Sequence, residues 1–299
     1  MRMPWMLGLL MMGISAPVWA QDAEPDGTID FELFRPASDA YGYMHMPSAA
    51  TLGHLQLGAG FWVQYENDPI ILTYEDARTP PSTAQVSRDN GESLVDDRIG
   101  SNIQVGLGIS RYFSFTIDAP MVLWQDGYQL TNLNNPNQPP DTLISAGLGD
   151  LRLQPKVVAI DRDRMPIGLA IQIPVGLPTG NGGSFLGEEG FSMNPSVVFE
   201  FSDGPIRSRQ YTFRSAVLAG YQVRPPDQLL GVDMTNAFSY GVGMGLHPTA
   251  LLEIMGEFHG AVWGNLAAQH AAEALGGVKF LIGDHVNITW TLLAEAIGY

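Results

Sequence analysis

Hydrophobic residues recur at every second position along most of the chain after residue 54. In the first such run Leu57, Phe61 and Val63 fall on one face, whereas Gln56 and Gln64 fall on the other. A period of two residues is typical of a β-strand with one apolar and one polar face. The pattern predicts eleven strands, at 55–65, 102–109, 113–123, 149–159, 167–177, 191–202, 210–223, 234–247, 250–262, 271–282 and 286–298.

The length of these runs favours strands that cross a membrane. Strands of globular proteins are most often about 5–6 residues long, whereas a tilted transmembrane strand needs about 9–11. Only 15% of the residues are charged, which is below the roughly 25% of an ordinary soluble domain. We therefore expect an all-β fold, an antiparallel transmembrane β-barrel. A secreted, soluble β-sandwich that binds glycans is the alternative.

The connections between the predicted strands alternate between long and short. The long polar segments fall at 67–97, 126–146, 180–190, 224–233 and 263–270. The short turns fall at 110–112, 161–164, 203–209, 247–249 and 283–285. Outer-membrane barrels have long extracellular loops and short periplasmic turns. A sandwich does not require this rhythm, so it favours the barrel.

Aromatic residues gather near the ends of the predicted strands. Transmembrane barrels carry an aromatic girdle at each membrane interface, although aromatic residues are also common in strands in general. The candidate girdle consists of Tyr65, Tyr112, Phe113, Trp124, Phe199, Phe201, Tyr211, Tyr221, Phe238 and Trp263.

The first twenty residues have the layout of a secretory signal peptide. Arg2 precedes an apolar stretch, and Ala20 provides a small residue at the expected cleavage point. The predicted division is a signal peptide at 1–20, a periplasmic or lumen-entering segment at 21–50 and a barrel at 51–299. This division predicts export to the outer membrane of a Gram-negative bacterium. The expected partners are membrane lipid and lipopolysaccharide.

Composition and motifs exclude several functions. The absence of Cys excludes disulfide frameworks, thiol nucleophiles and iron–sulfur clusters. A net charge of −16 argues against a nucleic-acid partner, because phosphate binding needs a basic face. No phosphate-binding loop, dinucleotide fingerprint or His-Glu-x-x-His motif occurs. We expect no enzyme activity and no cofactor, with a Ser, His and acid set assembled from separate strands as the alternative.

The polar face of the predicted strands carries charged residues of both signs. They are either the wall of a pore that selects solutes by charge or an internal network that fills a narrow barrel. About twelve strands lie between the filled eight-stranded and the open 16-stranded barrels, so both interpretations stand. The candidate lumen-lining residues are Asp118, Asp150, Arg152, Lys156, Glu200, Arg214, Glu253, Glu257, His259, Glu273, Lys279 and Glu295.

Two further features lie on the same face. Glu253, Glu257 and His259 alternate along one strand, but alternate residues lie about 7 Å apart, so a metal site would need ligands from other strands. We predict no metal site. Many other positions are glycine, which leaves space either for solute or for an inserted segment such as 21–50; they are Gly58, Gly60, Gly106, Gly108, Gly241, Gly243 and Gly245.

An odd number of strands leaves the predicted barrel open. Bacterial single-chain barrels normally have an even number of strands, and an unpaired edge in lipid is costly. We therefore expect about twelve strands. The closing strand is either 41–46 or a strand beyond Tyr299, and we favour a chain that lacks its last strand.

Several phrases of the sequence point to one family. They are FELFRPASDAYGY, GHLQLGAGFWVQYENDP, SLVDDRIGSNIQVGLGISRYFSFTIDAPMVLWQDG, GLGDLRLQPK and LPTG. In this order they resemble the N-terminal β-barrel region of large outer membrane protein A family proteins of Gram-negative bacteria, from about Phe31 onward. The resemblance implies a transmembrane barrel. It carries no peptidoglycan anchoring to this chain, because none of the domains that often follow the barrel occurs here.

Two functions fit these patterns. The first is a passive pore or transporter for small solutes. The second is a non-conducting structural barrel that anchors a partner domain, a partner barrel or another partner protein.

Overall fold

The computed structural model describes residues 34–73, 91–127, 143–180, 185–188, 190–229, 232–263, 270–282 and 286–298. The predicted signal peptide at 1–20, residues 21–33 and Tyr299 lie outside these ranges. Among the described residues, no helix is long and apolar enough to cross a membrane. The strands are β1 (Leu57–Thr73), β2 (Gly91–Ser110), β3 (Phe113–Gly127), β4 (Gly147–Leu148), β5 (Leu151–Ile160), β6 (Ile167–Gln172), β7 (Val175–Leu177), β8 (Ser192–Met193), β9 (Ser196–Ser202), β10 (Phe213–Gln222), β11 (Asp227–Leu229), β12 (Val232–Met234), β13 (Ala237–Thr249), β14 (Leu252–Trp263), β15 (His270–Ile282) and β16 (Val286–Gly298).

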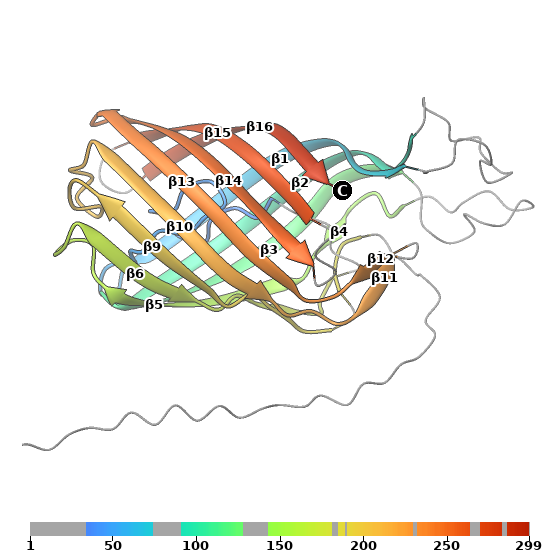
Figure 1. Cartoon of the computed structure of the whole chain (residues 1–299), viewed down its shortest axis with the longest axis horizontal. Coiled ribbons are helices and arrows are strands. Elements are labelled where there is room, and N and C mark those ends of the chain that lie inside the picture. The colour runs from blue at the N-terminus through green and yellow to red at the C-terminus, as the bar shows by residue number, and fades with distance from the viewer. Residues whose placement is uncertain are drawn as a thin grey trace, which may run out of the picture.

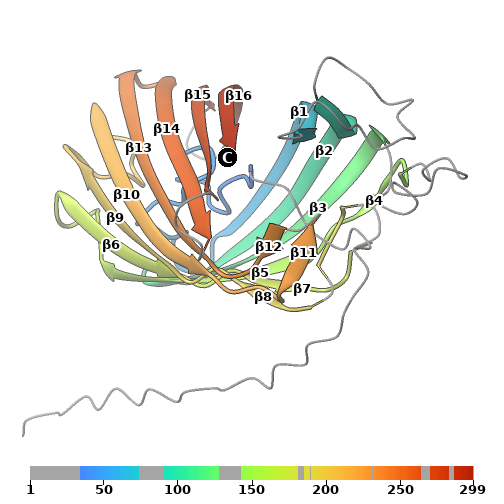
Figure 2. The same ribbon diagram turned by 45° about the vertical axis from the view of Figure 1, so that its right-hand side comes forward.

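Fourteen of these strands form one sheet that curls strongly around a central space (Figures 1 and 2). Its main path runs β1-β2-β3-β5-β6-β9-β10-β13-β14-β15-β16, so each strand lies beside the next full-length strand in the sequence. Each neighbouring pair is antiparallel. Strands β11 and β12 form a separate hairpin. The structure therefore confirms the predicted fold class, an all-β antiparallel barrel.

All eleven predicted strands are present in the predicted order, but two are divided. The run at 167–177 is divided into β6 and β7, and the run at 191–202 into β8 and β9, whereas the run at 149–159 forms the continuous strand β5. Pro174 and Pro195 lie in the two breaks. Proline has no N–H to donate to the ladder, so it interrupts regular pairing.

The sheet does not close on itself within the described residues. Strands β1 and β16 lie at the two ends of the hydrogen-bonded path and do not pair with each other; Figure 2 shows them on either side of the opening. The suggestion that residues 41–46 form the closing strand is wrong, because these residues form no strand.

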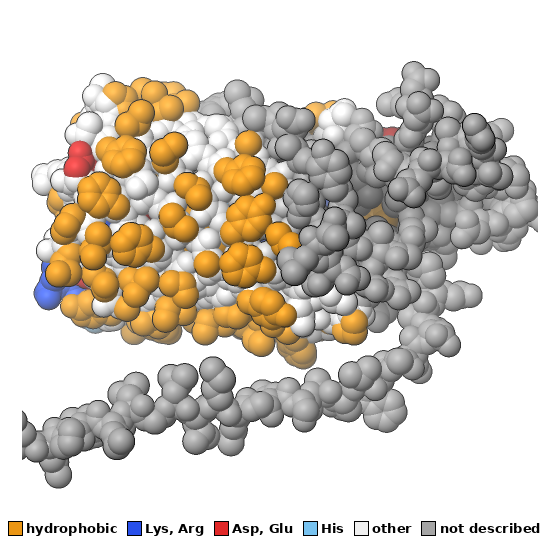
Figure 3. Space-filling model, in the orientation of Figure 1, with side chains coloured by type: hydrophobic (Ala, Val, Ile, Leu, Met, Phe, Trp, Pro, Cys, Tyr) orange, Lys and Arg blue, Asp and Glu red, His pale blue; other side chains and the backbone are white. Residues whose placement is uncertain are grey.

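The two faces of the sheet are inverted relative to a water-soluble protein. In β5, Arg152, Gln154 and Lys156 are buried, whereas Leu151 and Val157 are exposed. Strands β9, β10, β13 and β14 show the same alternation of burial. Figure 3 shows hydrophobic side chains spread over the outer surface of the sheet. The concave face therefore holds the polar side chains.

The concave face also holds residues 34–52, which we call the inner segment. Tyr43, Met44 and Met46 of this segment are buried in one hydrophobic cluster with side chains of the sheet, among them Val198 of β9 and Leu275 of β15. These contacts place the inner segment inside the curled sheet (Figure 2).

Candidate functional site in the barrel interior

Glu257 of β14 binds the backbone of the inner segment with both carboxylate oxygens. Its Oε2 accepts hydrogen bonds from the N–H groups of Met44 and His45, each at 3.1 Å, and its Oε1 accepts one from Met46 at 2.8 Å. The residue is 5% exposed. A buried carboxylate is costly unless it is hydrogen-bonded, and charge-assisted bonds to N–H groups are stronger than neutral ones. Glu257 therefore fixes three consecutive residues of the segment.

Glu200 of β9 makes a second attachment, nearer the end of the inner segment. Its Oε2 accepts hydrogen bonds from the hydroxyl of Ser48 and the N–H of Ala49, both at 2.7 Å. Arg162 and Arg214 each place a guanidinium nitrogen 3.6 Å from this carboxylate. The two arginines compensate the negative charge where the segment and the sheet meet.

Basic side chains bind the carbonyl groups of the same segment. Arg214 of β10 donates to the carbonyl of Tyr41 at 2.5 Å and to that of Gly42 at 3.3 Å, while its Nε lies 2.5 Å from Oε1 of Glu253. Lys279 of β15 donates to the Gly42 carbonyl at 2.5 Å. Backbone groups that are not paired in a strand thus find partners on the wall, as buried backbone requires.

The end of the inner segment is attached to the short turns of the sheet. Arg207 donates to the carbonyl of Thr51 at 2.9 Å and to that of Arg111 at 3.0 Å. The same guanidinium forms ion pairs with Asp161 and Asp163. The short turns 110–112, 161–164 and 203–209 are therefore linked through one arginine.

Two glycines of β13 allow the inner segment to approach the wall closely. A Cβ at Gly241 would lie 2.8 Å from Sδ of Met46, and a Cβ at Gly243 would lie 3.2 Å from the ring of Tyr43. The guanidinium of Arg214 lies 4.0 Å from the centre of that ring, a distance suited to cation–π attraction. Of the two uses proposed for the interior glycines, these positions make room for an inserted segment.

A pair of histidines stacks where the inner segment meets β14. The rings of His45 and His259 are parallel within 3°, with centroids 3.9 Å apart. Nε2 of His259 lies 3.3 Å from Oε2 of Glu273, and its Nδ1 lies 3.7 Å from Oε1 of Glu257. Burial, together with the nearby charge that His259 carries when protonated, holds the pKa of His45 well below its usual range. His45 is therefore neutral at pH 7.

The three residues of β14 that alternate in the sequence do not form a metal site. Glu253, Glu257 and His259 do share the concave face of β14. Within the described ranges, no group of three or more His, Asp or Glu side chains is arranged to hold a metal ion. Glu257 is instead bonded to the inner segment and Glu253 to Arg214.

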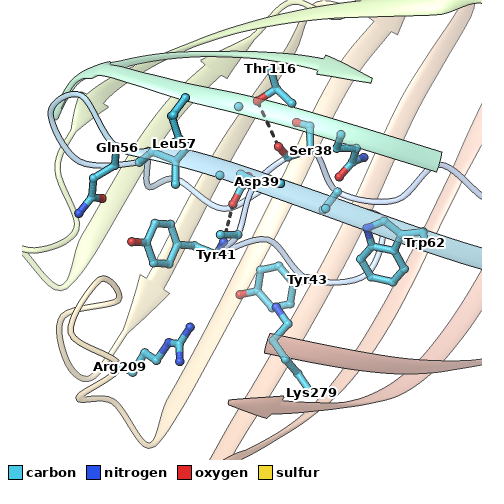
Figure 4. Close-up of a pocket in the computed structure, with 18 residues that line it drawn as sticks. Ser38, Asp39, Tyr41, Tyr43, Gln56, Leu57, Trp62, Thr116, Arg209 and Lys279 are labelled. Atoms are coloured by element: carbon cyan, nitrogen blue, oxygen red, sulfur yellow. Dashed lines mark hydrogen bonds between the residues drawn. The ribbon is translucent and has the colours of Figure 1, made fainter. Parts of the chain in front are cut away.

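A cavity of about 560 Å³ lies between the inner segment and the first strands (Figure 4). Its walls include Tyr41 and Tyr43 of the segment, Trp62 of β1, and the basic side chains of Arg209 and Lys279. Pockets of about 300–1,000 Å³ commonly hold small molecules. This space is therefore a candidate binding site.

Eleven of the twelve predicted lumen-lining residues are buried. The side chain of Glu295 lies outside the described part, and Asp150 bonds to the backbone N–H groups of Thr179, Gly180 and Glu188. Ion pairs link Arg152 to Asp118 and Arg214 to Glu253. The buried members are Asp118, Asp150, Arg152, Lys156, Glu200, Arg214, Glu253, Glu257, His259, Glu273 and Lys279. Their arrangement is that of an internal network.

The predicted aromatic girdle needs two corrections. Tyr211 and Trp263 are each 8% exposed and do not lie on the outer face. Tyr211 precedes β10 and stacks on His247, with ring centroids 4.9 Å apart. Trp263 shares the inward parity of Glu257 and His259 on β14. The exposed members are Tyr65, Tyr112, Trp124, Phe199, Phe201, Tyr221 and Phe238, and Phe113 is half-buried.

Three important residues were not singled out from the sequence. Asp39 pairs with Lys156 at 2.8 Å, His45 stacks on His259, and Arg162 is buried beside Glu200. Arg162 lies in the sequence Asp-Arg-Asp-Arg, which has the composition of an exposed turn. The sequence near such a turn does not indicate whether one of its arginines points inward or into solvent.

Comparison of the chain with protein-family models and with curated proteins gives no match.

Proposed function

We propose that this chain forms an outer-membrane β-barrel whose lumen is closed at rest by its own inner segment. The observation that carries the proposal is the inverted distribution of side chains. Glu200 and Arg214 are 0% and 1% exposed, whereas Phe61 and Val217 are 67% and 52% exposed. An outer apolar face with a polar interior is the arrangement of barrels that face lipid. Antiparallel pairing in a curled sheet supports the same assignment, because a membrane requires backbone groups to be paired internally.

The attachments of the inner segment support a closed resting state. Carboxylates of β9 and β14 bind its N–H groups, and basic side chains of β10 and β15 bind its carbonyls. Backbone groups of the inner segment therefore have hydrogen-bonding partners on the sheet along most of residues 39–51. Passage of small solutes through the barrel requires displacement of this segment, so the protein is a passive pore that is gated by its own chain.

A non-conducting structural barrel is the second candidate function. The same dense set of attachments favours it, since a segment that never leaves the interior stabilises the barrel as a core does. In that case the protein anchors a partner domain or partner protein, in line with the proposed relationship to the barrel region of outer membrane protein A family proteins.

Conductance of Glu257→Ala separates these functions. The mature chain is refolded in detergent, its folding is checked by heat-shifted gel mobility, and it is inserted into a planar bilayer. Loss of hydrogen bonds to a charged group costs about 1.5–3 kcal/mol, so we expect openings at least about tenfold more frequent than in the wild type. Asp150→Asn is the matched control, because Asp150 bonds to 179, 180 and 188 rather than to the inner segment.

The remaining outcomes are also informative. A folded Glu257→Ala protein that inserts but stays silent would favour the structural barrel. A wild-type protein that conducts steadily would show that the inner segment does not close the lumen. A folded chain that stays soluble without detergent would contradict the membrane assignment itself.

A further inference from the structure

Several glycines line the cavity beside the inner segment. Gly58 of β1 and Gly106 of β2 are direct partners in the ladder, and Gly60 follows on the same face of β1. Between Gln56 and Trp62, the inward positions of β1 therefore carry no side chain that extends into the cavity. The resulting space of about 560 Å³ is of the size that holds a small organic molecule.

Lys279 supplies this cavity with a buried positive charge, and its cross-strand partner Glu253 forms its ion pair with Arg214 instead. It is 4% exposed and donates one hydrogen bond, to the Gly42 carbonyl at 2.5 Å. An ammonium group carries three donors. Among the described side chains, no carboxylate oxygen lies within 4.0 Å of Nζ, whereas Arg152, Lys156, Arg162 and Arg214 each have at least one carboxylate within that distance.

Two other charged side chains, Asp39 and Arg209, line the cavity beside Lys279. The carboxylate of Asp39 also lines the space, but it pairs with Lys156 at 2.8 Å and accepts hydrogen bonds from the N–H groups of Tyr41 and Ser48. Arg209 adds a second basic side chain to the lining. A buried cation is costly without a counter-charge, so the cavity favours an anion.

Aromatic rings determine what kind of anion fits. Figure 4 shows Lys279 extending from β15 toward Tyr43, with Trp62 extending from β1 into the same space. Trp62 is half-buried and forms a T-shaped pair with the ring of Phe34, with a centroid distance of 6.3 Å. The Trp62 ring offers flat apolar surface beside a cation, whereas one face of the Tyr43 ring is covered by Arg214.

We propose that this cavity binds small organic anions, with a carboxylate at Lys279 and a flat apolar body against Trp62. The inference rests on the proposed function, for which it names a class of solute. Because residues 37–41 and Tyr43 form part of the wall, such an anion also contacts the inner segment. Binding of the anion and retention of the segment are therefore coupled.

The test uses benzoate with two matched probes. Titrations of the folded, detergent-refolded mature chain are followed by calorimetry and tryptophan fluorescence, with benzamide as the uncharged analogue and acetate as the anion without a ring. We expect benzoate to bind at least about tenfold more tightly than benzamide, since only its carboxylate makes a charge-assisted bond to the ammonium. We expect acetate to bind more weakly than benzoate.

Variants assign the effect to the named side chains. Lys279→Met should abolish the preference for benzoate over benzamide, and Lys279→Arg should restore it. Trp62→Leu should weaken both aromatic probes and keep the preference. Arg224 is a buried basic residue that pairs with Glu188 and does not line the cavity, so Arg224→Met should keep the preference as well.

Equal binding of benzoate and benzamide, no binding of either, or an unchanged preference in Lys279→Met would each overturn the inference. The titration needs only folded protein and no conductance. If the folded chain binds no probe, only the proposed anion site is contradicted. If it binds benzoate but never conducts in bilayers, only the proposed gated pore is contradicted.

Discussion

Gly243 shows how a single residue controls the fit between the inner segment and the wall. A Cβ at this position would lie 3.2 Å from the ring of Tyr43, which is buried and packed against Arg214. Overpacking of this kind costs about 1–3 kcal/mol. We expect Gly243→Val to lower the temperature at which the folded, heat-modifiable band disappears.

Gly256 provides the control for that substitution. It lies on the outward face of β14, and a Cβ there would meet no atom within 4 Å. Gly256→Val should leave the transition temperature close to that of the wild type. An equal loss in both variants would mean that valine disturbs the strands themselves rather than the contact with Tyr43.

At the scale of elements, docking of the inner segment should depend on pH through His45. Burial keeps the pKa of docked His45 well below its usual value of about 6.5. When the segment is displaced, the pKa returns toward 6.5, so below this pH the displaced state binds more protons than the docked state. Docking is therefore unaffected above about pH 6.5 and weakens as the pH falls, by up to about 1.4 kcal/mol per pH unit.

Bilayer recordings between pH 7.5 and 5 measure this dependence. Opening frequency should rise as the pH falls, by up to about tenfold per unit. His45→Phe keeps a ring stacked on His259 without a titratable group, and its openings should be nearly independent of pH in this range. A pH response that persists in His45→Phe would assign the effect to groups other than His45.

The elements differ in how far the sequence reveals them. Strands such as β5 and β10 were predictable, because alternate burial leaves a period of two in their residues. The inner segment has no such period, since its backbone is satisfied by Glu257 and Arg214 from distant strands. The parity of each strand indicated which charges face inward, but not that Glu200 and Glu257 bind the inner segment. The partner of each charge depends on how the strands curl around the segment.

At the scale of the whole molecule, a charged substitution on the outer face should destabilise the protein far more than the same substitution on a water-exposed surface. Val217 is 52% exposed in the middle of β10, between Phe199 and Val242 on the neighbouring strands. A lipid-facing arginine near the bilayer midplane costs about 2–4 kcal/mol, whereas an exposed substitution on a soluble protein usually stays within about 0.5 kcal/mol. We expect Val217→Arg to reduce folding into lipid vesicles strongly.

Leu251 supplies the comparison, because it is 65% exposed but lies in the turn between β13 and β14. Leu251→Arg should fold into vesicles with nearly the wild-type yield. Equal tolerance of arginine at both positions would contradict a lipid-facing surface and favour a soluble sheet.

The attachments of the inner segment also impose an order on folding. Met44 and Glu257 are 213 residues apart in the sequence, and Gly42 and Lys279 are 237 apart. Such long-range contacts form late, because the loop between them must be closed first. The inner segment, although it precedes every strand in the sequence, therefore docks only after β14 and β15 have joined the sheet. Docking of residues 42–46 thus marks completed assembly, and a barrel still lacking its last strands remains hollow.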